Sequence, residues 1–364
     1  MTEKKNKTRK ITARGVLLAL SLLFLAIFLI LARSAAGYAR HALSLIATAL
    51  VPSLFPFMVI SDLLSRGGFV AVVGRILEKP MKKIFRISGE GAGVMLLGML
   101  CGFPIGAKCA VALYDSGKLG ASECERLITI SSLPSAAFCI STVGGSLLSS
   151  VGAGIGLYLS TVISSLVVGA FAARFSKCAD ESIGAKKEEP PRQISVEDVT
   201  EAVTSSAIGV VKISGFVLFF SVLLGVLGEL LSLGRLDGAP LALLYSMLEL
   251  TSGAAKTAVL SCEGEALVLT AFALGWSSLS IHLQIMSLAA GRALRFSQYL
   301  ISKLLVGVIS ALLMLVGTSI FPVSIKSTGA VILTSGVPDQ VFYPLFCLFL
   351  ISLIVAIAKK IKSW

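Results

Sequence analysis

Long apolar segments recur along the whole chain and are separated by short polar or basic stretches. The first runs from Gly15 to Ala32 without a charge and follows a basic start, which favours an uncleaved membrane anchor. A cleaved signal peptide is the alternative, because small residues follow at 34–36. Further segments long enough to enter a bilayer lie at 41–64, 91–113, 124–148, 151–173, 207–231, 241–261, 265–290, 298–320 and 340–358.

Four of these segments contain helix-breaking residues near their middle. Glycine, proline or clustered serine and threonine interrupt them at 101–108, 131–136, 251–256 and 275–280. Non-helical backbone at membrane depth persists only where it is buried in protein or lines a wet cavity, because unsatisfied amides are costly in hydrocarbon. The four breaks therefore indicate a polar site inside the membrane.

The positions of Lys and Arg predict how the chain is oriented in the membrane. With a cytoplasmic N-terminus, the basic stretch 65–90 lies inside. A full crossing by 91–113 would put the basic stretch 174–206 outside, whereas a re-entrant hairpin bending at 102–106 returns it to the cytoplasm. The same choice at 241–261 places Arg292, Arg295, Lys303 and the C-terminal lysines inside. The charges therefore favour two hairpins, with both termini in the cytoplasm.

The two halves of the chain carry a weak internal repeat, which this topology orients in opposite directions. Ala107–Val111 matches Ala255–Val259 around a lysine, and Ser131–Leu133 matches Ser277–Leu279. Each match lies at a helix break, as in inverted-repeat carriers. We predict four parts: a basic N-terminus with the first transmembrane helix at 1–40, a first half-repeat at 41–175, a polar cytoplasmic linker at 176–206 and a second half-repeat at 207–364.

Composition narrows the functional classes. Hydrophobic residues make up 55% of the chain and charged residues 14%, against roughly 25% charged in a soluble domain. The net charge of +12 lies in clusters between apolar segments, so membrane topology explains it and nucleic-acid binding is not expected. The only histidines are His41 and His282, and no CxxC pair is present, which excludes the common zinc ligand sets. We expect no enzyme activity, no metal and no cofactor. Na⁺ or H⁺ is the expected coupling ion.

The candidate substrate-binding residues lie at the breaks. Lys108 and Lys256 are intramembrane cations in repeat-related positions, which favours an anionic or carbonyl-bearing solute. His282 titrates near neutral pH, so it is a candidate for substrate binding or proton transfer. The alternatives are structural: serines bonding to their own helices, glycines packing helices, lysines snorkelling and a buried histidine. The full set is Gly102, Phe103, Pro104, Gly106, Lys108, Ser131, Ser132, Ser135, Thr251, Ser252, Gly253, Lys256, Ser277, Ser278, His282 and Gln284, with an ion pair expected between Glu249 and Lys256.

Three segments resemble a known family. Pro52–Asp62, Gly102–Lys108 and Gly275–Gln284 are similar to the sporulation integral membrane proteins of the YlbJ type, which fall in the Gate or nucleoside-recognition membrane superfamily. The resemblance runs from about residue 41 to the C-terminus. It implies an endospore-forming bacterium and a role in spore development, in cortex formation.

The superfamily is also similar to concentrative nucleoside transporters and to the gate of ferrous-iron permeases, which have inverted repeats, re-entrant hairpins and broken helices. The resemblance implies glycines where Ser277 and Ser278 stand. It implies functional positions at two hairpin tips and two broken helices, here Gly102–Lys108, Thr251–Lys256, Ser131–Ser135 and Trp276–Gln284.

We predict an all-α polytopic protein of the inner cell membrane with an inverted-repeat, transporter-like core. It would carry a small polar solute, such as a nucleoside or an anion, by alternating access during sporulation. The alternative is a non-transporting scaffold or assembly factor for the spore cortex that recruits proteins through 174–206. The expected partners are the lipid bilayer, the solute, other sporulation membrane proteins and a second copy in a homo-oligomer.

Overall fold

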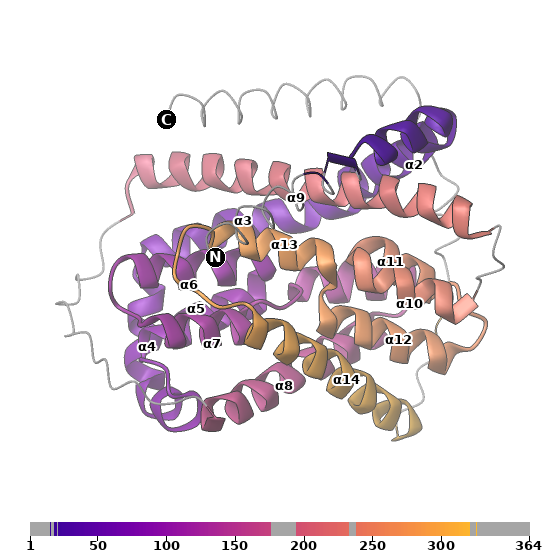
Figure 1. Ribbon diagram of the computed structural model, residues 1–364. Coiled ribbons are helices and arrows are strands. Elements are labelled where there is room, and N and C mark those ends of the chain that lie inside the picture. Colours follow the sequence, from indigo (N-terminus) through magenta and orange to yellow (C-terminus); the bar gives the residue numbers. More distant parts are fainter. Residues whose placement is uncertain are drawn as a thin grey trace, which may run out of the picture.

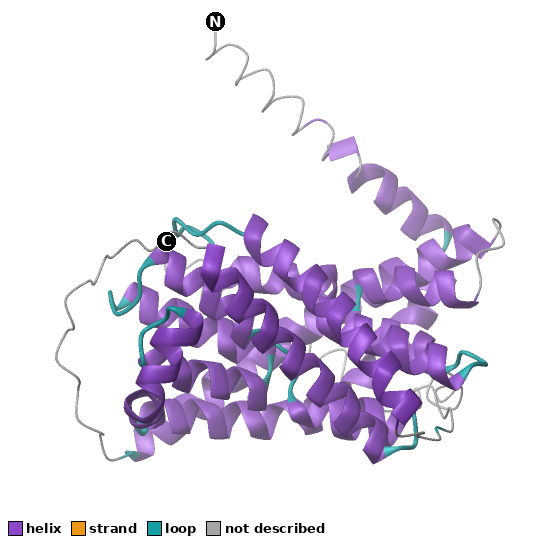
Figure 2. Ribbon diagram, turned by 90° about the horizontal axis from the view of Figure 1, so that it is seen from below, coloured by secondary structure: helices purple, strands orange, loops and turns teal. Residues whose placement is uncertain are grey.

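The fold comes from a computed structural model that describes Gly15, residues 18–19, 21–175, 194–232, 238–320 and 325. These residues form helices and connecting loops, with no strand among them (Figures 1 and 2). The apolar segment at 340–358, the basic residues 1–14 and most of the expected linker lie outside the described residues. The fold class expected from the sequence is confirmed.

The first half of the chain consists of helices that break often. A helix at Ser21–Ile30 bends by 94° into the next. The following elements are α2 (Ala32–Leu45), the π-helix η1 (Ile46–Leu50), α3 (Val51–Arg66), α4 (Phe69–Pro80), the π-helix η2 (Met81–Phe85), α5 (Glu90–Cys101), α6 (Phe103–Asp115), α7 (Ala121–Ser131), the π-helix η3 (Phe138–Leu147) and α8 (Val151–Phe175).

The second half contains α9, which runs along one side of the molecule at the top of Figure 1. At about 1.5 Å per residue its 37 residues measure roughly 55 Å, more than a bilayer core of about 30 Å. The elements are α9 (Val196–Ser232), α10 (Gly238–Leu248), α11 (Leu250–Ala258), α12 (Glu263–Trp276), α13 (Ser278–Leu288) and α14 (Ser297–Ile320).

The start of α9 corrects the expected linker boundary at 206. Ser195 and Asp198 form a reciprocal cap, in which Asp198 Oδ2 accepts from Ser195 N at 2.9 Å and Ser195 Oγ accepts from Asp198 N at 3.2 Å. Such a capping box satisfies amide groups that a helix start leaves free. The polar residues from Val196 to Ser206 therefore form the first turns of α9.

The described helices include several that are able to cross a bilayer. Four spans are long and apolar enough, namely Val151–Phe175, Val196–Glu229, Glu263–Leu288 and Ser297–Ile320, and two bent pairs of helices bring the total to as many as six. Their outer surfaces are apolar, as lipid contact requires. On α8 the exposed stripe repeats every four residues: Val151, Ile155, Leu159, Ile163, Val167, Phe171 and Phe175. The protein is therefore a multi-pass membrane protein.

The two halves repeat one order of elements. A helical hairpin (α5–α6 or α10–α11) is followed by a broken helix (α7–η3 or α12–α13) and then by a long helix (α8 or α14). Packing between the halves is reciprocal, because α6 contacts α13 while α11 contacts η3, and α8 contacts α14. Each hairpin thus lies against the broken helix of the other half (Figure 1).

Candidate functional site

The first hairpin turns at a single residue, Gly102. Its φ of +97° and ψ of −177° belong to a region that side chains rarely adopt, and α5 ends directly before it. Pro104 stands in the first turn of α6, where a missing amide hydrogen leaves no helix bond unmade. The break expected over 101–108 is therefore narrower: Phe103, Pro104, Gly106 and Lys108 are helical.

The second hairpin turns at Glu249. Its backbone is extended, and its two carboxylate oxygens accept hydrogen bonds from Thr251 N at 2.9 Å and Ser252 N at 2.6 Å. A carboxylate in this position caps a helix and faces the positive end of its dipole. The prediction that this hairpin turns at 251–256 is therefore wrong by about one helical turn. The residues expected at the tip lie within α11, namely Thr251, Ser252, Gly253 and Lys256.

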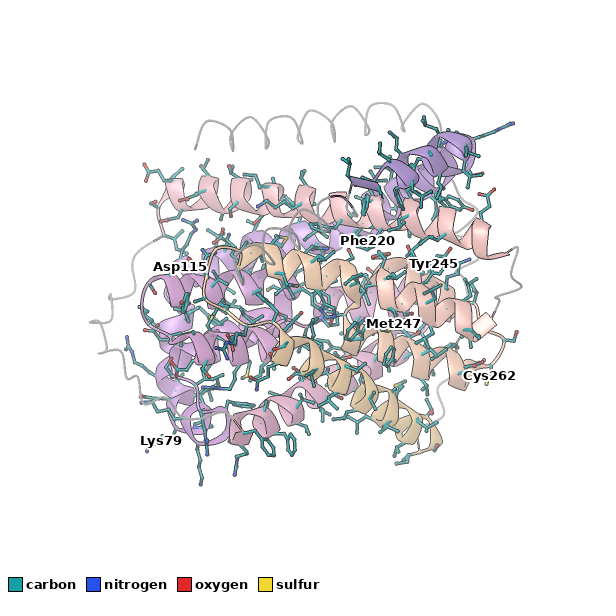
Figure 3. The ribbon with its side chains drawn as sticks, viewed as in Figure 1. Lys79, Asp115, Phe220, Tyr245, Met247 and Cys262 are labelled. Carbon is teal, nitrogen blue, oxygen red and sulfur yellow. The ribbon has the colours of Figure 1, made fainter. Side chains whose placement is uncertain are left out.

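The ion pair expected between Glu249 and Lys256 is not formed. The Glu249 carboxylate binds the backbone of α11, whereas Lys256 Nζ lies over the ring of Tyr245, 5.5 Å from its centroid. Tyr245, labelled in Figure 3, is fixed by its hydroxyl, which donates to the Leu224 carbonyl oxygen at 2.9 Å. Lys256 therefore makes a cation–π contact between α11 and α10.

The broken helix of the first half is open from Ser132 to Ser135. Ser135 Oγ accepts from Phe138 N at 3.1 Å and so begins the next helix. A Cβ on Gly98 or on Gly106 would clash with the Ser131 carbonyl oxygen, so the first hairpin packs directly on this break. The hydroxyls of Ser131 and Ser132 are buried without a hydrogen-bond partner in the structure.

The broken helix of the second half changes direction at two consecutive serines. Ser277 and Ser278 have φ values of 78° and 70°, in the left-handed region that glycine adopts without strain. Ser277 Oγ donates to the carbonyl oxygens of Leu274 at 3.4 Å and Gly275 at 3.3 Å, whereas the buried Ser278 hydroxyl has no hydrogen-bond partner among the described residues. The left-handed backbone explains why the resemblance implies glycines at these positions.

Parts of both hairpins and both broken helices surround one small cavity of about 40 Å³. At roughly 10–15 Å³ of such volume per water, it holds about three or four waters. Glu249 is 1% exposed and contributes a buried carboxylate to the wall. The central cavity, as we call it, is lined by Gly102, Phe103, Pro104, Ser135, Phe138, Glu249, Leu250, Thr251, Ile281 and Gln284, with apolar residues Leu50, Leu54, Cys101, Ile213 and Val217.

A larger cavity of about 310 Å³ adjoins the central one, with Pro104, Ile213 and Gln284 lining both. Its size is at the lower end of the range for small-molecule sites. We call it the vestibule, and it lies between α3, α6, α9 and α13. Its polar residues are Ser61, Asp62, Lys108, Ser205, Ser206, Lys212, Gln284 and Ser287.

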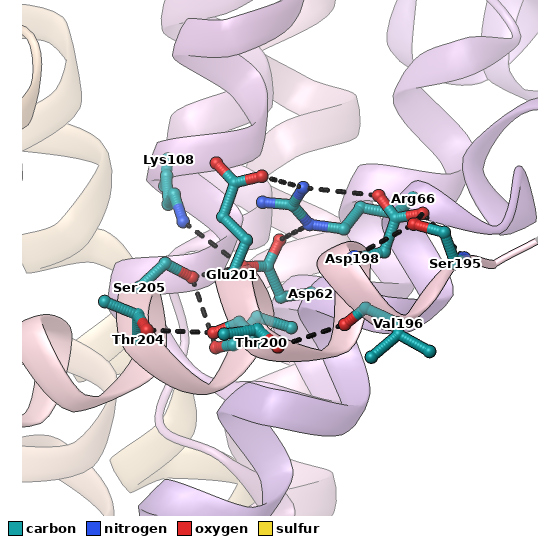
Figure 4. A network of polar contacts seen from close by, with 11 residues as sticks. Asp62, Arg66, Lys108, Ser195, Val196, Asp198, Thr200, Glu201, Thr204 and Ser205 are labelled. Carbon is teal, nitrogen blue, oxygen red and sulfur yellow. Dashed lines mark hydrogen bonds and ion pairs between the residues drawn. The ribbon is translucent and has the colours of Figure 1, made fainter.

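A network of charges links α3, α6 and α9 beside the vestibule (Figure 4). Asp62 is 3.8 Å from Lys108 Nζ and 3.3 Å from Arg66 Nε, and it accepts a hydrogen bond from Ser205 Oγ. Arg66 Nη1 also lies 2.8 Å from the Glu201 carboxylate. Lys108 is 55% exposed, so its pair is weak, about 0–1 kcal/mol, and is easily broken.

The candidate residues divide into a first group that lines one of the two cavities and a second group that does not. Lys108 lines the vestibule, and Gly102, Phe103, Pro104, Ser135, Thr251 and Gln284 line the central cavity. The remaining candidates lie outside both linings: Gly106, Ser131, Ser132, Ser252, Gly253, Lys256, Ser277, Ser278 and His282.

His282 belongs to the second group because it faces α14. Its Nδ1 is 3.1 Å from the Tyr299 hydroxyl, and its ring packs edge to face on Trp276 with centroids 4.5 Å apart. The side chain is fully buried, and Nε2 has no hydrogen-bond partner in the structure.

Two buried charges were missed as site residues. The sequence predicts Glu249 only as an ion-pair partner. Its position shortly before Thr251, Ser252 and Gly253 was the signal in the sequence that could have indicated a helix cap. The loop charges predict a cytoplasmic Lys303, although this residue lies within the apolar segment 298–320. It is 0% exposed and donates a hydrogen bond to the Ser132 carbonyl oxygen.

The comparisons with known proteins agree with this architecture. Residues 47–154 match the family model described as Gate, nucleoside recognition, a range that includes the first hairpin and the first broken helix. The chain is 29% identical over 296 residues to the sporulation integral membrane protein YlbJ of Bacillus subtilis (strain 168), an alignment that covers 71% of this chain and 72% of that protein. No solved structure gives a significant match. The resemblance expected from the sequence is confirmed.

Proposed function

We propose that this chain is a secondary carrier that moves a small polar solute across the cell membrane by alternating access. One observation supports the proposal most strongly: both hairpins and both broken helices contribute to one cavity, whose mostly apolar wall contains the buried Glu249 carboxylate. In carriers built from repeats, such breaks provide backbone and side-chain groups that bind solute near the membrane centre. The similarity to a protein named for sporulation leads us to place this transport in spore formation.

The vestibule suggests the class of solute. Its charged wall residues are Asp62, Lys108 and Lys212, so cationic groups outnumber anionic ones. An anionic group on a solute would gain from the two lysines, while Gln284 supplies both a donor and an acceptor. A small carboxylate therefore fits best. A nucleoside, which the family description suggests, would rely on Gln284 and the serine hydroxyls instead.

The direction of opening follows from the loop charges. The vestibule lies beside Arg66 and the first turns of α9, next to the basic stretch 65–90. The charge rule places that stretch in the cytoplasm. We therefore propose that the structure represents a state open to the cytoplasm, with the Asp62–Lys108 pair on the solute path.

Ligand-induced stabilisation of the purified protein tests the proposal. The panel contains small dicarboxylates, pyridine carboxylates, amino acids and nucleosides, each compared with buffer at equal ionic strength. A ligand that binds the native state raises its stability by about 2.7 kcal/mol at a hundredfold excess over the dissociation constant. We expect one class to act, with the effect lost in Gln284→Ala and weakened in Lys108→Ala.

Lys83→Ala is the matched control, because Lys83 is exposed and lies outside both cavities. It should respond to the ligand as the unaltered protein does. A flat response to the whole panel, together with normal sporulation by both cavity variants, would contradict the carrier. If sporulation then failed on deletion of residues 176–193, the scaffold would replace it.

A further inference from the structure

Lys303 is a cation that is fully buried in the part of the chain that the structure describes. It lies on α14, and no ion pair joins it to an acidic side chain among the residues that the structure describes. One turn earlier, the Tyr299 hydroxyl contacts His282. An ammonium group in this setting is costly unless other oxygens replace its water.

The oxygen that replaces this water comes from the break in α7. Helix ends leave carbonyl groups without intrahelical partners, and these carry partial negative charge. Ile130 O accepts from Ser165 Oγ at 3.2 Å, and Ser131 O accepts from Leu133 N at 3.1 Å. The next carbonyl, that of Ser132, accepts from Lys303 Nζ.

Further oxygens stand at the same break. The hydroxyls of Ser131 and Ser132 are buried and have no hydrogen-bond partner in the structure. Carbonyl and hydroxyl oxygens at an unwound helix are the usual ligands of monovalent coupling cations. The break that follows α7 thus offers one carbonyl oxygen that binds the ammonium group of Lys303 and two buried hydroxyl oxygens with no hydrogen-bond partner in the structure.

The second broken helix offers a contrast. There the Leu274 and Gly275 carbonyl oxygens accept from Ser277 Oγ, a hydroxyl of the same break. That break therefore satisfies freed carbonyls with its own side chain, whereas the first uses a cation from another helix. The asymmetry places a positive charge at one of the two repeat-related breaks.

We propose that Lys303 is a tethered cation that occupies a monovalent-cation site at the α7 break, so that the protein needs no Na⁺ there. The consequence for transport rests on the proposed function and deepens it: a carrier whose cation site is occupied by its own lysine would transport independently of Na⁺. The occupancy of the site can be tested without any solute.

The test is thermal stability of the purified full chain in NaCl, KCl, methylammonium chloride or choline chloride at equal concentration. Lys303→Ala removes the ammonium and leaves space for a small cation, so we expect a saturable rise in melting temperature of about 2–4 °C in methylammonium or Na⁺ over choline. Unaltered protein should show no difference between these salts. Lys303→Met fills the space with an apolar chain and should not respond either.

Three results would overturn the inference: selective stabilisation of the unaltered protein by Na⁺, an equal response of Lys303→Met, or no response of Lys303→Ala to any small cation. If Lys303→Ala is too unstable to purify, its folded yield after extraction in methylammonium or in choline is the readout, with the same expectations. Solute binding by the unaltered protein is measured separately. Its absence would refute the carrier without affecting the cation result, so the two failures are distinguishable.

Discussion

Glycine at position 278 should stabilise the protein, although glycine usually weakens a helix. Ser278 has a φ of 70°, and a side chain in this region costs roughly 1–2 kcal/mol. Glycine avoids that strain but loses about 0.5–1 kcal/mol through the greater freedom of its unfolded chain. The balance favours Ser278→Gly over Ser278→Ala by up to about 1.5 kcal/mol. Alanine is the right reference, because both variants remove the unpartnered hydroxyl and only glycine relieves the backbone.

Ser280, two residues further on, is the matched control. It is also buried, but it lies inside α13 and is not among the residues with positive φ. There Ser280→Gly should be less stable than Ser280→Ala by about 1 kcal/mol. Melting temperatures of the four variants in one detergent decide the matter. If glycine is worse than alanine at both positions, the left-handed geometry of the second break and the strain argument are refuted.

Three further predictions concern other parts of the molecule. Glu249→Ala should cost about 1 kcal/mol of stability through loss of the α11 cap, and a variant as stable as the unaltered protein would contradict that role. A double-mutant cycle of Asp62→Asn and Lys108→Ala should give a coupling of about 0.2–1 kcal/mol that weakens with salt, whereas a larger, salt-independent value would mean a buried pair. At the end of α6, the Arg292 guanidinium lowers the pKa of the Asp115 carboxyl, so this pair stabilises the fold above about pH 4 and ceases to do so as the pH falls through the lowered pKa. Asp115→Asn should remove this part of the acid sensitivity, and an unchanged stability profile between pH 7 and pH 3 would count against it.

Helix breakers in the sequence located the regions of interest but not always the turning residue. Gly102 was found within its region because glycine and proline both indicate an interruption. The second turn was placed about one turn too late, because Gly253 looked like a breaker. The structure shows Gly253 packed against the backbone of Ser246 instead. Small residues serve close helix packing as well as turns, and sequence alone does not separate the two uses.

The candidate site was harder to predict than the fold because it depends on which faces of the helices meet. Gln284 lines both cavities, whereas His282, two residues earlier, points to Tyr299. Successive positions on a helix differ by about 100° in direction, so a break identifies a region and not the side chains that face the cavity. Lys303 was overlooked for a related reason: its partner, the Ser132 carbonyl, belongs to the other half of the chain.

The central claim is that the cavity between the two hairpins opens in turn to the two sides of the membrane. Ile213→Cys, in a chain whose seven native cysteines have been replaced, places one thiol where the central cavity and the vestibule adjoin and leaves Gln284 in place to bind the solute. A charged, membrane-impermeant thiol reagent is then added to inside-out and to right-side-out vesicles. Alternating access predicts labelling from both sides, with solute protecting the thiol. Labelling from one side only, unchanged by any solute of the panel, would contradict alternating access.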